Sequence, residues 1–203
     1  MKRKITNLLV IASMFAFGSS FAQDAYKEGG SQVNLGVGFI TNFVTIPSGT
    51  GYTTHSIPPI SASYEYGITD KISVGGYLGY TSTGWDYTYT TNDLTKAGFP
   101  KVDATSTTTY SYTIFGVRGS YHFATSDKLD PYAGAMLGYN VASVSWTTND
   151  PNTGGINIAP VAASAVAFSA HLGARYFFTD NIGAFAEIGY GVAIANLGLT
   201  LKF

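Results

Sequence analysis

The sequence predicts an all-β fold: an eight-stranded antiparallel up-and-down β-barrel that crosses a membrane. In eight segments, apolar residues alternate with small polar ones, which is the period that a strand with one apolar face requires. Only 11% of the residues are charged although 45% are hydrophobic, whereas soluble domains carry about 25% charged residues. No apolar run beyond the N-terminal region is long enough for a membrane helix, so any membrane span has to be built from strands.

The N-terminal region has the order of a secretory signal peptide. Basic residues at positions 2–4 precede an apolar stretch at 8–17 and a small-residue segment at 18–22, and this order is typical of cleaved export signals. The apolar stretch is shorter than the ~18 residues that a membrane helix needs, which argues against an N-terminal anchor. We therefore expect a signal peptide at residues 1–22, followed by one barrel domain at residues 23–203.

The first four alternating segments place an apolar or aromatic residue at nearly every second position. The intervening residues are Asn and Gly in Val33–Phe39, Ser and Glu in Ile60–Tyr66, Ser and Gly in Ile72–Tyr80, and Gly, Arg, Ser and His in Phe115–Phe123. Each segment therefore reads as a strand with one apolar and one polar face.

The last four segments repeat this pattern. Ala133–Val141 alternates with Gly and Asn, Val166–Tyr176 with Ser, His, Gly and Arg, Ile182–Tyr190 with Gly and Glu, and Ala195–Phe203 with Asn, Gly, Thr and Lys. Eight antiparallel strands are an even number, as closed bacterial membrane barrels have.

The expected connections alternate in length. The short ones are Gly67–Lys71, Ala124–Asp130 and Phe178–Asn181, and the long ones are Val44–Pro58, Gly84–Thr107 and Trp146–Val161. Short turns at one end and long loops at the other are typical of outer-membrane barrels. The last connection, near residues 191–193, is shorter than this pattern predicts.

A soluble sandwich or lipocalin-like barrel is the main alternative fold. It would expose a face of Gly, Ser, Asn and Thr with few charges, and glycine is disfavoured inside strands unless space is tight. In a small membrane barrel, such residues instead fit the narrow lumen while the apolar set faces lipid. The 24 glycines and the scarcity of charge favour the membrane barrel.

Two turn units and the C-terminal strand carry a family resemblance. Tyr66–Val74 and Tyr176–Gly183 both read as an aromatic strand end, Thr-Asp and a new strand, and the chain ends on Phe203. From Val33 onwards the sequence resembles the eight-stranded, porin-like cell-surface barrels of the OmpA N-terminal domain, OmpX and OmpW type. The resemblance implies location in the outer membrane of a Gram-negative bacterium. It does not extend to a peptidoglycan-binding domain, so cell-wall anchoring is not implied.

The same resemblance implies partners. The C-terminal strand resembles the signal that the barrel-assembly machinery recognises, carried here by Leu199, Leu201 and Phe203. We expect outer-membrane lipids around a monomeric barrel, and an unknown extracellular ligand for the long loops. Without the three basic residues of the signal, eight Lys and Arg face 12 Asp and Glu, so nothing indicates nucleic acid.

The polar face of the predicted strands carries ionisable residues into the lumen. By strand parity these are Glu65, Arg118, His122, His171, Arg175, Glu187 and Lys202. Buried charges are costly unless they are paired. We therefore predict an ion-pair network that closes the lumen, formed by Glu65, Arg118, Arg175, Glu187 and Lys202.

A hairpin with an aromatic face is expected within residues 82–112, where alternation continues beyond the roughly 10 residues of a membrane strand. The predicted mouth aromatic cluster consists of Trp85, Tyr87, Tyr89, Tyr110, Tyr112 and Trp146. These rings either stiffen the hairpin by packing on one another, or capture an apolar or sugar-bearing ligand, or leave an edge for an external strand.

The sequence favours a structural or surface-binding role, adhesion-like, without enzymatic activity. A lipid A-modifying enzyme would need a Ser, a His and an acid within hydrogen-bond reach. His122 and His171 face inward, however, and His55 falls in the first long loop. A narrow OmpW-like channel for small hydrophobic solutes is the other alternative. With no cysteine and three scattered histidines, we expect no metal site and no cofactor.

Overall fold

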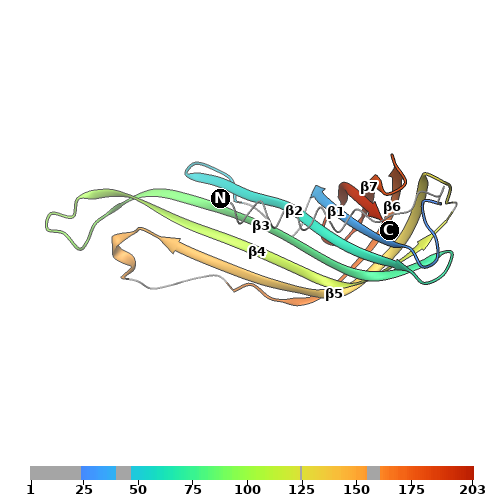
Figure 1. Ribbon diagram of the computed structural model, residues 1–203. Helices are drawn as coiled ribbons and strands as arrows, with labels where there is room; N and C mark the ends of the chain where they lie inside the picture. The colour runs from blue at the N-terminus through green and yellow to red at the C-terminus, as the bar shows by residue number, and fades with distance from the viewer. Residues whose placement is uncertain (1–23, 40–46, 124, 155–160) are drawn as a thin grey trace, which may run out of the picture.

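Eight antiparallel strands close into a barrel, as the sequence predicts (Figure 1). The computed structural model describes residues 24–39, 47–123, 125–154 and 161–203; the expected signal peptide lies outside them. The strands are β1 (Ser31–Phe39), β2 (Tyr52–Gly67), β3 (Ile72–Asn92), β4 (Lys101–His122), β5 (Leu129–Thr148), β6 (Ala165–Phe177), β7 (Ile182–Tyr190) and β8 (Ala195–Lys202). Each pairs with its neighbours in the sequence, and β1 pairs with β8. Among the described residues, no helix has the length and apolar character of a membrane span.

The apolar set of each strand faces outward. Leu35, Leu78, Val117 and Leu137 are each more than half exposed, although a soluble protein would bury such side chains. The residues between them are buried in the lumen, among them Asn34 and Arg118. This inversion is what a lipid-facing barrel requires.

Strand length divides the molecule into two regions. β1, β7 and β8 have nine, nine and eight residues, whereas β2 to β5 have 16, 21, 22 and 20. All eight strands pair in the part that we call the ring. Beyond it, β2 to β5 continue as a four-stranded sheet that we call the extension, formed by 52–57, 81–92, 101–112 and 142–148. Figure 1 shows this extension projecting far to the left of the ring.

The extension corrects three of the expected connections. β3 and β4 occupy most of 84–107, pairing as far as Asn92 and Lys101. β5 continues to Thr148, and β2 begins at Tyr52, so His55 lies in a strand rather than a loop. Threonine and tyrosine have high strand propensity, and they keep the alternation going after the apolar residues end.

β5 begins earlier than expected, which corrects the short connection at 124–130. Leu129 is the first residue of β5, so Asp130 lies inside the strand and is fully buried in the lumen.

β2 contains an irregularity at two prolines, Pro58 and Pro59. Its pairing register with β3 shifts between Ile57 and Ile60. Proline donates no backbone hydrogen bond, and the shift marks the point where β2 leaves the ring.

Candidate functional site

The ring is filled near its short turns by a buried polar network centred on Arg175. Arg175 Nη2 donates to Glu65 Oε1 at 2.6 Å, and Nη1 donates to Asp130 Oδ2 at 2.9 Å. Its Nε donates to Asn34 Oδ1 at 3.2 Å. Its guanidinium also lies over the Tyr132 ring, 4.0 Å from the centroid. A guanidinium offers five donors and accepts nothing, and this one contacts partners on three other strands, β1, β2 and β5.

Arg118 forms the second layer of the network, farther from the short turns. Arg118 Nη2 donates to Glu187 Oε1 at 2.5 Å, and Tyr132 Oη donates to the same oxygen at 2.9 Å. Arg118 Nε lies 3.1 Å from Glu65 Oε1, but this contact lacks hydrogen-bond geometry, so it is an ion pair only. The lumen at this height is thus spanned by contacts between β4, β5 and β7.

Glycine makes room for this layer. A Cβ on Gly173 would lie 2.8 Å from Glu187 Cγ and 2.8 Å from the Tyr132 ring, which is closer than side-chain atoms approach one another. Small residues at lumen positions are therefore needed for the large polar side chains to meet across the barrel.

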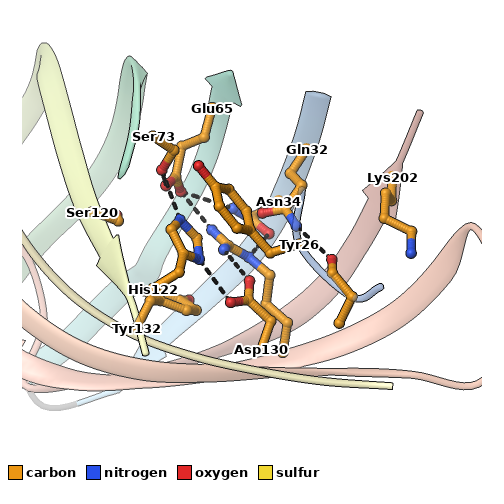
Figure 2. Close-up of polar contacts among 12 residues, drawn as sticks. Tyr26, Gln32, Asn34, Glu65, Ser73, Ser120, His122, Asp130, Tyr132 and Lys202 are labelled. Atoms are coloured by element: carbon orange, nitrogen blue, oxygen red, sulfur yellow. Dashed lines mark hydrogen bonds and ion pairs between the residues drawn. The ribbon is translucent and has the colours of Figure 1, made fainter. Parts of the chain in front are cut away.

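His122 lies between two acceptors (Figure 2). Its Nδ1 is 2.7 Å from Asp130 Oδ1, and its Nε2 is 2.9 Å from Ser73 Oγ. Ser73 Oγ donates to Glu65 Oε2 at 2.8 Å. Because a hydroxyl has one proton to give, Ser73 has to accept from Nε2 while Asp130 accepts from Nδ1. Both ring nitrogens of His122 are therefore donors, and the ring is an imidazolium.

His171 is in the opposite state. Arg118 Nη2 donates to His171 Nε2 at 2.9 Å, and since a guanidinium only donates, this nitrogen carries no proton. His171 is therefore neutral. The network then holds three carboxylates, two guanidiniums and one imidazolium, which balance. Neutrality of the whole cluster lowers the cost of burying its members.

The chain before β1 covers the short-turn end of the network. We call residues Asp24–Gly30 the N-terminal cap. Ala25 N donates to Ser126 O, and Tyr26 Oη donates to Thr69 O, both at 2.9 Å. The Tyr26 ring stacks on His122 with centroids 3.5 Å apart and an interplanar angle of 7°. Burial, followed by the negative charges of Asp130 and Glu65, raises the pKa of Tyr26 to about 12.

The structure brings together four of the five residues predicted for the lumen network, Glu65, Arg118, Arg175 and Glu187. The fifth, Lys202, lies nearer the cap. Its Nζ donates to the backbone oxygen of Asp24 at 2.9 Å and lies 4.7 Å from the centroid of the Phe177 ring. Lys202 therefore ties β8 to the cap.

Sequence reasoning missed four members of the network, Asp130, Ser73, Tyr132 and Tyr26. The sequence pattern predicts a turn at Asp130, although its parity with Gly134 in the same segment indicates the lumen. Ser73 has lumen parity, but one serine among many carries no signal of its own. Tyr26 precedes the first alternating segment, where no period exists to place it.

The predicted mouth aromatic cluster lies on the inner face of the extension. Trp85 stacks with Tyr110, with centroids 5.8 Å apart, and Tyr87 stacks with Tyr89 at 5.3 Å. Tyr87 also stacks on Tyr52 of β2 at 4.7 Å.

The last two members of the cluster are placed by register. Trp146 pairs with Thr108, which is also the partner of Trp85 on the other side. Tyr112 pairs with Thr81 and Ala142. All six predicted residues therefore share one face.

The tip of the extension is clamped by the β5–β6 connection. Asn152 Oδ1 accepts from Leu94 N at 2.9 Å, and Asn152 Nδ2 donates to Asn92 O at 2.8 Å. Tyr89 Oη donates to Asp150 Oδ2 at 2.7 Å. The backbone N–H of Asn152 and then this hydroxyl lower the pKa of Asp150 below its ordinary value.

Residues of the predicted C-terminal signal lie on the outer face. Leu199 is 58% exposed and Phe203 is 45% exposed, and Ser31 and Phe203 exchange backbone hydrogen bonds at the β1–β8 seam.

In the part of the chain that the structure describes, no group of three or more His, Asp or Glu side chains is placed to hold a metal.

The sequence matches a family described as outer membrane protein beta-barrel domain over residues 9–202. A search of curated proteins found no match. Solved structures of barrels are similar at low identity. OprG from Pseudomonas aeruginosa is 11% identical with a TM-score of 0.48, covering 88% of this chain and 97% of that chain.

Two further solved structures show the same level of similarity. The N-terminal β-barrel domain of Pseudomonas aeruginosa OprF is 16% identical with a TM-score of 0.43, covering 89% of this chain and 100% of that chain. Ail, the attachment invasion locus protein of Yersinia pestis, in complex with the heparin analogue sucrose octasulfate, is 13% identical with a TM-score of 0.45, covering 87% and 99%.

Proposed function

Because this chain belongs to the outer membrane protein β-barrel domain family, which it matches over residues 9–202, we propose that it is a surface-binding protein of the outer membrane. The ring anchors it in the membrane, and the extension presents a binding face outside the cell. The short turns then lie in the periplasm and the long strands project outward, as in other outer-membrane barrels.

The length of β2 to β5 carries the proposal. Membrane strands need about 9–11 residues, yet β3 and β4 have 21 and 22. The surplus residues form an ordered sheet with an aromatic inner face and a clamped tip. An ordered projection of this size has no use in anchoring, whereas rigid aromatic side chains are typical of binding surfaces.

A channel for small hydrophobic solutes is the alternative function, and the side chains that fill the lumen argue against it. Arg118, Glu187 and Tyr132 meet across it, and Arg175 and the cap lie below them. A solute would have to break several charge-assisted hydrogen bonds to pass. We propose that the ring does not conduct, and a planar bilayer recording distinguishes the two roles.

The Ser73, His122 and Asp130 contacts resemble a hydrolase triad, but three features support a non-enzymatic role. A catalytic histidine takes the serine proton through a free Nε2, whereas here Nε2 donates. Ser73 Oγ donates to Glu65 instead, and the Ser73 side chain is 1% exposed. We expect no labelling of Ser73 by a fluorophosphonate and no mass change of lipid A on expression; either result would favour the enzyme.

We further propose how the barrel is assembled and what surrounds it in the membrane. Leu199, Leu201 and Phe203 form the signal for the barrel-assembly machinery, since β8 ends at the seam that closes the ring. Outer-membrane lipids cover the outer face, which carries the exposed apolar side chains. We expect the protein to act as a monomer, because β1 and β8 pair with one another and the ring therefore has no unpaired edge strand.

Intrinsic fluorescence tests the binding role directly. Trp85 and Trp146 flank Thr108 on the inner face of the extension, so a ligand there changes the fluorescence of both. We expect protein in lipid nanodiscs to respond to at least one member of a panel of glycans and matrix proteins. A Trp85→Phe variant should retain a partial response through Trp146. A panel that leaves both variants unchanged would contradict the proposal and leave the aromatic rings a purely structural role.

A further inference from the structure

The far end of the extension is a two-stranded hairpin. The pairing of β3 with β2 ends at Tyr87, and that of β4 with β5 ends at Ser106. β3 and β4 continue to pair with one another as far as Asn92 and Lys101. Residues 93–100, which we call the tip loop, join these two strands at the far left end of the projection in Figure 1. The tip loop is therefore the part of the extension that first meets a surface facing the cell.

Hydrogen bonds order the backbone of the tip loop. Asp93 N donates to Pro100 O at 2.8 Å, which continues the pairing of β3 and β4 by one residue. Lys96 N donates to Asp93 O at 3.4 Å and Phe99 N donates to Lys96 O at 3.2 Å, so two turns close the loop. The Asp93 side chain is buried and accepts from Thr95 N at 3.0 Å. The side chains of the loop are thus presented from an ordered backbone.

Two large apolar side chains of the tip loop are exposed. Leu94 is 64% exposed and Phe99 is 58% exposed, more than any other large hydrophobic residue of the extension that the structure describes. Continuing the register from Asp93 and Pro100 places Leu94 opposite Phe99. The two residues therefore form an apolar pair at the end of the hairpin.

The backbone of Phe99 indicates that its ring has a use. Phe99 has a φ of 47° and follows Gly98, whose φ is 83°, and it is the one non-glycine residue with a positive φ among the described residues. A bulky side chain is strained in this region, whereas glycine is not. Such strain is typical of functional positions. Because the ring is mostly exposed, its use is expected in binding rather than in folding.

The size of the apolar pair favours a lipid surface over a protein as its partner. A specific protein interface buries about 800 Å² on each partner, and two side chains at the end of a hairpin offer much less. A lipid interface has no such minimum, because each apolar side chain that leaves water contributes by its own area. β3 continues from Tyr80 to Asn92, which is ~40 Å of strand at ~3.3 Å per residue. The tip loop is therefore held away from its own membrane.

The charges at the end of the hairpin indicate a neutral lipid head group. Lys96 Nζ lies 3.0 Å from Asp93 Oδ2, so this lysine is already paired. The charge of Lys101 is offset by those of Asp103 and Asp150, which leaves the end of the hairpin without a net positive charge. Attraction to anionic lipids requires clustered basic residues. Apolar insertion therefore has to supply the binding.

We propose that the tip loop inserts Leu94 and Phe99 into a zwitterionic phospholipid surface that faces the cell. Insertion by one copy is weak and reversible, because two side chains bury a small apolar area. Many copies on one cell bind the same surface together, which raises the overall affinity. The proposal goes beyond the binding role of the inner face, since neither residue belongs to the mouth aromatic cluster.

Fluorescence quenching tests the insertion. The sequence contains no cysteine, so Ala97→Cys in the tip loop can carry a single NBD label, and Thr53→Cys in the exposed part of β2 carries the same label as a control. Protein in lipid nanodiscs is mixed with phosphatidylcholine vesicles whose acyl chains bear a doxyl quencher. We expect saturable quenching and a blue shift of the label at position 97 only. Quenching of both labels, or of neither, would overturn the proposal.

Substitutions at Phe99 separate the ring from the backbone. Phe99→Gly suits the positive φ but removes the ring, so the affinity of the labelled protein for vesicles should fall about tenfold, while hydrogen exchange at Leu94 stays slow. Phe99→Trp keeps an apolar ring and should retain the affinity. Ile57→Ser, which removes an exposed apolar side chain elsewhere in the extension, should also retain it. An unchanged affinity in Phe99→Gly, or a tenfold loss in either of the other variants, would overturn the proposal.

Salt distinguishes insertion from attraction between charges. A tenfold increase in salt concentration should change the affinity for the vesicles by less than about twofold, because screening weakens charge interactions and leaves apolar burial intact. A larger loss of affinity would mean that charge holds the tip loop at the surface, and it would overturn the proposal.

Discussion

The ring and the extension are built from the same alternating strands, but they use opposite chemistry on their outer faces. In the ring, the outward residues of β3 are apolar up to Tyr80. In the extension they become Ser82, Gly84 and Asp86. In β4 the same change occurs between Phe115 and Thr113, and Thr113 is the partner of Tyr80. The two strands therefore leave the membrane at the same height.

The inner faces differ as well. The ring buries charged side chains in pairs, whereas the extension places stacked aromatic rings on its inner face. Alternation alone consequently does not show where the membrane ends, because it continues unchanged across the boundary. The residue type on the outer face marks the boundary, since hydroxyl side chains gain nothing from lipid.

The largest difference between the regions is expected when a network charge is removed. Arg175→Ala leaves Glu65 and Asp130 without their shared partner, and breaking a buried pair costs about 3–5 kcal/mol. Urea unfolding in lipid vesicles measures the change. Lys101→Ala, an exposed charge at the tip of the extension, is the control and should change stability by no more than about 0.5 kcal/mol. Equal effects of the two variants would show that the ring does not depend on its network.

A smaller loss is expected at His122. His122→Phe keeps a ring against Tyr26 but removes the donors to Asp130 and Ser73, at a cost of about 2–3 kcal/mol for bonds to charged groups. The loss is smaller than for Arg175→Ala because Asp130 keeps its bond to Arg175. Nitrogen NMR of the folded protein should show protons on both ring nitrogens of His122 and none on His171 Nε2. An unprotonated nitrogen in His122 would contradict the charge balance.

Because Tyr26 lies in the cap, the stability of the folded protein should depend on pH in the alkaline range. The pKa of Tyr26 is raised to about 12 by burial and by nearby carboxylates, against 10.0 ordinarily. The folded state thus retains the phenol proton longer than the unfolded state, so the stabilisation is complete below pH 10 and is lost as pH rises toward 12. Wild type should lose stability over this window relative to Tyr26→Phe. A constant difference between the two proteins would show that Tyr26 does not titrate in the cap.

The smallest effect is expected at the tip clamp. Asn152→Ala removes the bonds to Leu94 N and Asn92 O but touches nothing in the ring. Global unfolding should stay unchanged, while hydrogen exchange at Leu94 becomes faster because its amide is released. Lys101→Ala again serves as the control, with no change at Leu94. A shift in the global unfolding midpoint would mean that ring and extension unfold as one unit.

The sequence was sufficient for the strands, the closure and four network residues, because a period of two assigns each residue to a face. It was insufficient wherever no period applies. The pattern predicts a turn at Asp130 because strand ends are poorly marked in a sequence. The contact between Tyr26 and His122 joins residues about a hundred positions apart, where no period applies. Lys202 has the correct parity but a different height, and parity carries no information about height across the barrel.

Electrical recording in planar bilayers tests the central claim, that the ring is sealed by its buried network and that the working surface is the extension. Wild-type protein should produce no stepwise current under conditions in which a reference porin conducts, because Arg118, Glu187 and Tyr132 span the lumen above Arg175 and the cap. Stepwise current through the folded wild-type protein would contradict the claim and identify the ring itself as the functional part.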